Sequence, residues 1–170
     1  MKSYSVSMVK KYADKKKLIG ELTEEMREID RLELEGMGFS SLQGAEFSIM
    51  ETSPVYVARS NAGKLIACWG LEILDFKRND GSHSYSYVIW ALGTDELKHF
   101  EKSFVKESSA YIKRWVELYG CLQNTVATFN KRAIKWLKWL GAEFSAPYKI
   151  GSTEYVNFKI EKRKESEGNV

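Results

Sequence analysis

The stretch of residues 87–144 constrains the fold most, because the spacing of its apolar residues changes along it. Residues 87–92 form an apolar run that is too short for a helix and has the length of a buried strand. After a break at residues 93–95, apolar side chains recur three, four or seven positions apart, which predicts one face of a long helix. These side chains are Leu97, Phe100, Phe104, Tyr111, Trp115 and Leu118.

A second strand and a short helix complete this stretch. Gly120 favours the end of the long helix, residues 122–129 have strand character, and Asn130 begins a short helix that Gly141 is placed to end. Glycine can adopt the left-handed conformation at a helix end because it has no Cβ. A strand, a helix and a strand in this order predict a βαβ crossover with parallel strands and the long helix over the sheet.

The rest of the chain predicts a mixed sheet in an α/β (α+β) fold. Residues 23–36 have a helical period with Thr23 as N-cap, and the basic residues 10–17 are a solvated helix start or loop. Ser40 and Gln43 have the spacing of a capping box for a helix to about residue 50. Further strands are expected at residues 4–8, 55–59, 64–71 and 154–160. The sheet would have six to seven strands, with about four helices.

Composition indicates a soluble globular protein of one domain. The 170 residues are 44% hydrophobic and 29% charged, and a net charge of +3 does not by itself indicate a nucleic-acid-binding protein. We expect the domain to span residues 1–160 and residues 161–170 to be a disordered tail. No apolar run approaches the roughly 18 residues that span a bilayer, and the N-terminus lacks the apolar core of a signal peptide. We therefore expect a cytoplasmic location and no membrane partner.

The cysteines and histidines do not predict a metal site. Cys68, Cys121, His83 and His99 show no metal-ligand spacing. Each cysteine is expected to be a small buried apolar residue.

The element order β-α-α-β-β-β-α-β-α-β resembles that of the Gcn5-related N-acetyltransferase (GNAT) superfamily. The segment Asn130-Lys-Arg-Ala-Ile-Lys-Trp-Leu-Lys-Trp-Leu-Gly-Ala-Glu-Phe144 is similar to the family's Asn-x-x-Ala-Ile motif, which ends in Leu-Gly-Phe. Residues 90–95, Trp-Ala-Leu-Gly-Thr-Asp, together with residues 130–141 resemble more narrowly the GNAT-like small internal virion proteins of short-tailed phages. That similarity extends over residues 24–160. The resemblance implies that the central parallel strands splay apart.

In GNAT enzymes acetyl-CoA lies between the splayed strands, with its pyrophosphate on backbone amides at the start of the long helix. The resemblance places cofactor-binding positions at Ile89, Trp90, Ala91, Leu92, Gly93, Thr94 and Asn130. Only one glycine stands where the family has Gln or Arg followed by two small residues, and Asp95 and Glu96 would repel a pyrophosphate. We therefore expect a degenerate site. Asp95 and Asn130 are alternatively interpreted as helix caps.

The sequence identifies no catalytic residue. The family's tyrosine that protonates the departing thiolate corresponds here to Leu137, which cannot donate a proton. Glu51, Glu72 and Asp75 are carboxylates that could act as a base, but each is predicted to be a surface residue.

Three functions remain open. The preferred one is a phage internal virion or assembly component with phage structural or host proteins as partners, in the host cytoplasm or the virion. The alternative is an acetyl-CoA-dependent N-acyltransferase in which backbone amides at residues 89–91 polarise the thioester and water replaces the missing acid. Nucleic-acid binding through Lys131, Lys135, Lys138 and the basic residues 10–17 ranks lowest, because the net charge is only +3. The three lysines also suit a solvated helix face. Trp139 beside them would mark a protein interface if it were exposed.

Overall fold

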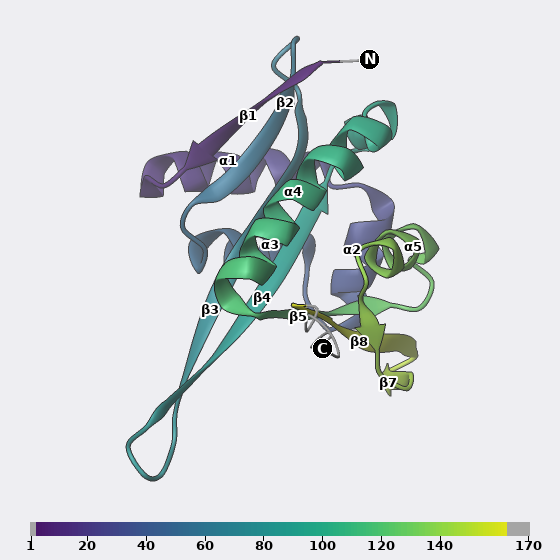
Figure 1. Cartoon of the computed structure of the whole chain (residues 1–170). Helices are drawn as coiled ribbons and strands as arrows, with labels where there is room; N and C mark the ends of the chain where they lie inside the picture. Colours follow the sequence, from purple (N-terminus) through teal and green to yellow (C-terminus); the bar gives the residue numbers. More distant parts are fainter. Residues whose placement is uncertain (1–2, 163–170) are drawn as a thin grey trace, which may run out of the picture.

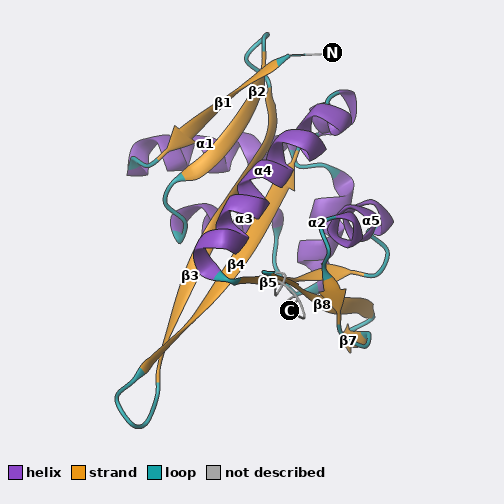
Figure 2. Cartoon of the chain, in the orientation of Figure 1, coloured by secondary structure: helices purple, strands orange, loops and turns teal. Residues whose placement is uncertain are grey.

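The computed structural model describes residues 3–162, which form one mixed sheet with helices on both of its faces (Figures 1 and 2). The strand order is β1-β2-β3-β4-β5-β8-β6, and β7 also pairs with β8. The elements are β1 (Tyr4–Val9), α1 (Tyr12–Glu25), α2 (Glu28–Gly36), α3 (Ser41–Met50), β2 (Val55–Ser60), β3 (Leu65–Lys77), β4 (His83–Gly93), the 3₁₀ helix η1 (Asp95–His99), α4 (Glu101–Tyr119), β5 (Cys121–Ala127), α5 (Lys131–Trp139), β6 (Glu143–Phe144), β7 (Tyr148–Ile150) and β8 (Thr153–Glu161).

Two apolar cores lie on opposite faces of the sheet. The first core is formed by α4 and α5 against the strands, with Trp69, Phe104 and Trp115 among its buried aromatic residues. The second core is formed by α1 and α3, which bury Leu22 and Ile49 completely. Burial of an aliphatic side chain of this size stabilises a fold by about 1.5–3 kcal/mol. The helices on both faces therefore stabilise the sheet.

The expected βαβ crossover is confirmed, and its two strands splay apart. β4 runs parallel to β5, and the two strands pair only at Val88↔Gln123. On its other side β5 pairs with β8 over its whole length, from Cys121↔Glu161 to Ala127↔Tyr155. The sheet is therefore two halves, β1–β4 and β5–β8, joined near one pair of residues.

Local sequence signals are confirmed at three helix ends. Ser40 and Gln43 form the predicted capping box, with the Gln43 N–H donating to Ser40 Oγ at 3.1 Å. Asn130 Oδ1 accepts from the Ala133 N–H at 3.2 Å and caps α5. Gly141 follows α5 with φ of 87°, the left-handed conformation expected there.

The prediction of one helix over residues 23–36, capped by Thr23, is wrong. Thr23 lies inside α1, the chain then becomes extended at Met26, and α2 begins at Glu28. The Arg27 N–H donates to the Gly93 oxygen at 3.0 Å, and Met26 forms an isolated antiparallel β-bridge with Thr94. This pairing with the end of β4 interrupts the helical pattern that the sequence suggests.

The start and the buried face of the long helix also differ from expectation. Asp95 does not cap α4, because residues 95–99 form the 3₁₀ helix and Thr94 Oγ1 accepts from the Glu96 N–H. Leu118, predicted to lie on the buried face, is 63% exposed. Leu97, Phe100, Phe104 and Trp115 are buried as predicted.

The strand and helix counts exceed the prediction slightly, with eight strands and five α-helices in residues 3–162. The additional strands β6 and β7 are too short to leave a period in the sequence. Glu161 still belongs to β8 and Lys162 follows it, whereas residues 163–170 of the expected tail lie outside the described residues. No helix within residues 3–162 is long and apolar enough to cross a membrane.

β3 and β4 continue beyond the sheet as a two-stranded arm, which Figure 1 shows projecting at the lower left. Their pairing keeps one register from Ala67↔Gly93 to Lys77↔His83. The arm exposes about half of the side chains of Ile73, Phe76 and Tyr85.

Candidate functional site

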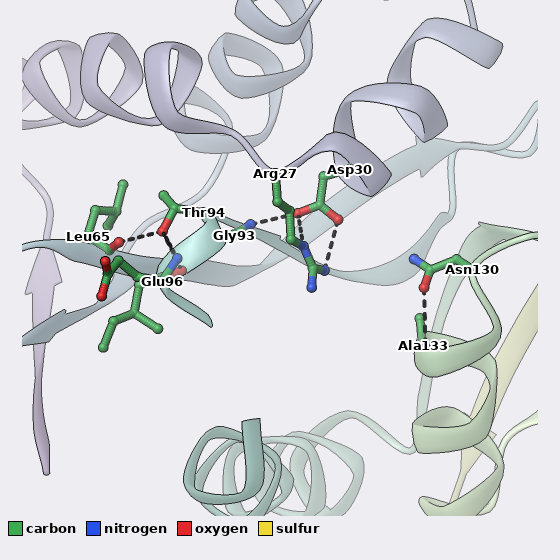
Figure 3. Close-up of polar contacts among 9 residues, drawn as sticks. Arg27, Asp30, Leu65, Gly93, Thr94, Glu96, Asn130 and Ala133 are labelled. Carbon is green, nitrogen blue, oxygen red and sulfur yellow. Dashed lines mark hydrogen bonds and ion pairs between the residues drawn. The ribbon is translucent and has the colours of Figure 1, made fainter. Parts of the chain in front are cut away.

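A cleft of about 760 Å³ opens at the carboxyl ends of β4 and β5, where the two strands separate. In open α/β sheets ligands bind at such a point, outside the ends of diverging parallel strands. Figure 3 shows residues of α2, α5 and the end of β4 around the opening. The cleft brings together five of the seven predicted cofactor-binding positions, namely Ile89, Trp90, Ala91, Leu92 and Asn130. Gly93 and Thr94 do not line it.

Along the β4 edge, the N–H and C=O groups of every second residue face the gap between β4 and β5. The Thr94 N–H donates to the Ile66 oxygen of β3 at 3.0 Å. Because strand residues alternate in direction, Ile89, Ala91 and Gly93 turn their N–H and C=O groups away from β3, towards the gap. Ala91 lies three residues beyond the last pair with β5 and is exposed. The β4 edge at Ala91 is therefore open to a ligand.

Asn124 of β5 bridges the gap where the pairing ends. Its side-chain Nδ2 donates to the Ile89 oxygen at 2.7 Å, and its Oδ1 accepts from the Thr125 N–H at 2.7 Å. One amide side chain thus satisfies a backbone acceptor on β4 and a donor on β5. This position was not singled out from the sequence, because its β4 partner is 35 residues away.

Gly93 is covered by a carboxylate of α2. The Gly93 N–H donates to Asp30 Oδ2 at 2.7 Å, and Arg27 donates to the same carboxylate through Nε at 2.7 Å and Nη2 at 2.9 Å (Figure 3). The Asp30 side chain is 2% exposed and that of Arg27 is 29% exposed. A buried carboxylate therefore receives the donor that the family resemblance assigns to a pyrophosphate.

Neighbouring amides after β4 are also engaged within the chain. The Thr94 N–H is bonded to Ile66 in the sheet, the Glu96 N–H donates to Thr94 Oγ1 at 3.3 Å, and the Leu97 N–H donates to the Thr94 oxygen at 3.1 Å. Thr94 Oγ1 itself donates to the Leu65 oxygen at 2.6 Å, as Figure 3 shows. The N–H groups of Gly93, Thr94, Glu96 and Leu97 are therefore already bonded within the chain.

Glu33 of α2 is the cleft residue with the most unusual ionisation. Burial raises its pKa from the ordinary 4.5 to about 7, and the Asp30 charge adds to this shift. The Ala127 N–H, which donates to Glu33 Oε1 at 2.8 Å, and the Asn130 side chain partly offset it. A carboxylate with a pKa near 7 can accept or release a proton at neutral pH.

Sequence reasoning missed Glu33, because its spacing in α2 is that of any helical carboxylate and its partner Ala127 is 94 residues away. Tyr155 holds the same segment in place, since its hydroxyl donates to the Glu33 backbone oxygen at 2.8 Å.

Glu72 is not the surface residue that the sequence predicts. It is 8% exposed and lines the cleft, because it points from β3 to the face of the sheet opposite α4. Burial raises its pKa, and the Glu51 charge adds to that shift. Glu51 and Asp75 are exposed as predicted, and His83 Nδ1 lies 2.7 Å from Asp75 Oδ1.

Apolar and basic side chains line the α4 and α5 walls of the cleft. The apolar residues are Phe104, Ile112, Trp115, Trp136 and Leu137. Leu137, at the position of the family's proton donor, is 3% exposed and cannot take that role. Arg132 of α5 pairs with Glu101 of α4 across the opening.

Of the other residues considered from the sequence, Lys135 and Trp139 also line the cleft, whereas Lys131, Lys138 and Cys68 do not. Lys131, Lys135 and Lys138 are exposed along α5, and Trp139 beside them is 62% exposed. Cys68 is completely buried, and its burial raises the pKa of its thiol. Within residues 3–162, His, Cys, Asp and Glu side chains do not gather in threes as a metal site would require.

Solved structures with the same arrangement of elements are acetyltransferases. The aminoglycoside N(6')acetyltransferase from Legionella pneumophila is 13% identical, with a TM-score of 0.61, over 95% of this chain and 93% of that one. The ribosomal-protein-S18-alanine N-acetyltransferase from Escherichia coli is 11% identical, with a TM-score of 0.60, over 99% of each chain. A GCN5-related N-acetyltransferase from Kribbella flavida is 13% identical, with a TM-score of 0.58, over 94% of this chain and 98% of that one.

The chain has the GNAT fold. Neither a protein-family model nor a curated protein sequence matches it. At 11–13% identity the structural likeness concerns the fold, so the function has to be argued from the cleft itself. The gap between β4 and β5 lies where the family resemblance places acetyl-CoA, and Asp30 is bonded to Gly93 on the β4 side of it.

Proposed function

We propose that this GNAT-fold chain does not turn over acetyl-CoA and acts through protein contacts, as an internal virion or assembly component of a short-tailed phage. The observation that carries the proposal is the hydrogen bond from the Gly93 N–H to the buried Asp30 carboxylate. A pyrophosphate at this amide would meet a negative charge at hydrogen-bond distance, which repels it strongly where water is excluded. The degenerate acetyl-CoA site is part of the proposal.

The phage role draws its support from the resemblance of residues 90–95 and 130–141 to the internal virion proteins. Its partners would be phage structural or host proteins, met in the host cytoplasm or inside the virion. Phe47 and Trp139, which line the cleft and are 58% and 62% exposed, are suited to such contacts. Aromatic side chains contribute more than most residue types to the binding energy of protein interfaces.

A titration with acetyl-CoA tests the proposal. We expect the melting temperature of the protein to stay unchanged at millimolar acetyl-CoA, measured beside a GNAT enzyme of known activity as a positive control. A ligand at 100 times its Kd stabilises a protein by about 2.7 kcal/mol, which for a chain of this length raises Tm by about 5 to 10 °C. A rise of this size would reject the proposal.

The assembly role needs a separate measurement. A tagged copy of the chain, expressed during infection, is expected to retain specific phage structural proteins on affinity purification and to occur in purified virions by mass spectrometry. The variant Trp139→Ala removes an exposed aromatic side chain and should weaken the retention, whereas Phe76→Ala in the distant arm should not. Absence of the chain from purified virions, with no phage protein retained, would contradict this role.

A second candidate, an acyl-CoA-dependent N-acyltransferase, is favoured by one observation. Glu33, with a pKa of about 7, lies in the cleft and could take the proton of an amine acceptor. If the wild-type protein acylates amines, the Glu33→Gln variant should lose activity by roughly 10²-fold or more, as expected for removal of a general base. Wild-type protein that stays inactive with a panel of amines would remove this candidate.

A further inference from the structure

We infer that Asp30 is a built-in substitute for an anionic ligand, and that removing its carboxylate exposes a diphosphate-binding site made by Arg27 and the Gly93 amide. The inference rests on the proposed function, because it explains why the cleft would not accept acetyl-CoA. It goes beyond that proposal by assigning the Arg27 and Gly93 donors to a diphosphate once the Asp30 carboxylate is removed.

The donors around Asp30 are those that proteins use for phosphate. Arg27 meets the carboxylate with two nitrogens, Nε and Nη2, at 2.7 and 2.9 Å. The Gly93 N–H adds a third donor at 2.7 Å, on the oxygen that Arg27 Nε also contacts. A guanidinium fork and a backbone amide on one oxyanion form a common phosphate-binding arrangement. The same three donors would therefore suit a phosphate oxygen.

The backbone at Gly93 allows the guanidinium to approach closely. A Cβ built on Gly93 would lie 3.4 Å from Arg27 Nε and 3.1 Å from Leu97 Cδ2. Because glycine has no Cβ, the Leu97 and Arg27 side chains can pack closely around its amide without a clash. A second bond, from the Arg27 N–H to the Gly93 oxygen at 3.0 Å, fixes the two residues relative to each other. The donors would thus stay in place when the Asp30 side chain is shortened.

Asp30 fills this arrangement from inside the chain. It lies in the first turn of α2, where a carboxylate is also stabilised by the helix dipole. Its side chain is 2% exposed, so an incoming anion cannot share the donors with it. An anion that displaced the Asp30 carboxylate from these donors would leave that negative charge close to its own. Glu33 and Glu101, which also line the cleft, would add to the repulsion.

The test compares wild-type protein with the Asp30→Ala variant, using inorganic pyrophosphate as the probe in phosphate-free buffer. We expect pyrophosphate to raise the Tm of Asp30→Ala by about 5 to 10 °C at 100 times its Kd, and to leave that of the wild type unchanged. Calorimetric titration should give a Kd at least 10-fold lower for the variant. Glu28→Ala, which removes an exposed carboxylate from the same helical turn, should behave as the wild type.

The double variant Arg27→Ala with Asp30→Ala separates a specific site from a mere loss of charge, because it removes the guanidinium and should lose the gained binding. If Asp30→Ala does not fold, Asp30→Ser also removes the charge and shortens the side chain, and it should still bind pyrophosphate more tightly than the wild type. A folded variant with no gain, or equal gain in Glu28→Ala, would overturn the inference. Acetyl-CoA binding to the wild type would instead refute the proposed function.

Discussion

Glu33 shows how one half-buried carboxylate links the stability of this protein to pH. Its pKa is about 7 when folded and about 4.5 when unfolded, so the folded state binds its proton more tightly. The stability that protonated Glu33 provides is complete below pH 4.5 and declines by about 3 kcal/mol as the pH rises to 7. We therefore expect Glu33→Gln to gain stability relative to the wild type across this range, as measured by urea unfolding at pH 5 and pH 8.

The design includes a control on the same helix. Glu35→Gln removes a carboxylate that is 47% exposed and pairs with Arg31. Its stability difference from the wild type should change little between pH 5 and pH 8. Parallel pH profiles for the wild type and Glu33→Gln would show that the Glu33 carboxylate stays ionised in the folded protein.

Single residues also mark the limit of what the sequence predicts. Asn130 and Ala133 are three positions apart, and a spacing rule therefore predicted the helix cap between them. Asp30 and Gly93 are 63 positions apart, and their hydrogen bond depends on how α2 crosses the end of β4. Helical periodicity predicts which face of a helix is polar, but it does not predict which amide a given carboxylate will reach.

At the scale of whole elements, the strands β3 and β4 were predicted in their buried parts and underestimated in length. Residues 65–71 and 87–92 are apolar because the two cores cover them. Residues 73–77 and 83–85 pair equally well but have solvent around them, so their side chains follow no burial pattern. The length of the arm therefore follows from the backbone pairing and could not be predicted from the sequence pattern.

The arm should be the first part of the folded protein that a protease cuts. Its turn contains Arg78 beside Lys77, both exposed and distant from either core. Brief digestion with trypsin is expected to cut there and to leave two fragments that remain associated through the sheet. Gel filtration followed by denaturing electrophoresis would detect such a nicked complex.

A double variant, Lys77→Gln with Arg78→Gln, controls for this site. It should resist the first cleavage while keeping the Tm of the wild type, because neither side chain contributes to a core. Initial cleavage within α4 or β5 would instead show that the arm is better protected than its exposure suggests.

At the scale of the whole molecule, the two sheet halves are joined by few polar contacts near the cleft. β4 and β5 share the pair Val88↔Gln123, and the Asn124 side chain bridges them just beyond it. The Ala127 N–H adds a bond to Glu33 of α2. The GNAT fold was predictable from the order of elements, but this bridging was not, because Asn124 is an ordinary polar residue within a strand pattern.

Asn124 should therefore control how firmly the cleft is held. Asn124→Ala leaves the Ile89 oxygen and the Thr125 N–H without their partner, at a cost of about 1–3 kcal/mol. The opening should concentrate at the gap, so amide hydrogen exchange at Thr125, whose N–H loses its bond to Asn124, should accelerate more than at Leu92, which faces β3. Asn61→Ala, which removes an exposed bond to Ser3, should change neither quantity. Uniform acceleration of exchange across the sheet would contradict this prediction. It would mean that the two halves unfold together and that the Asn124 bridge stabilises the whole sheet equally.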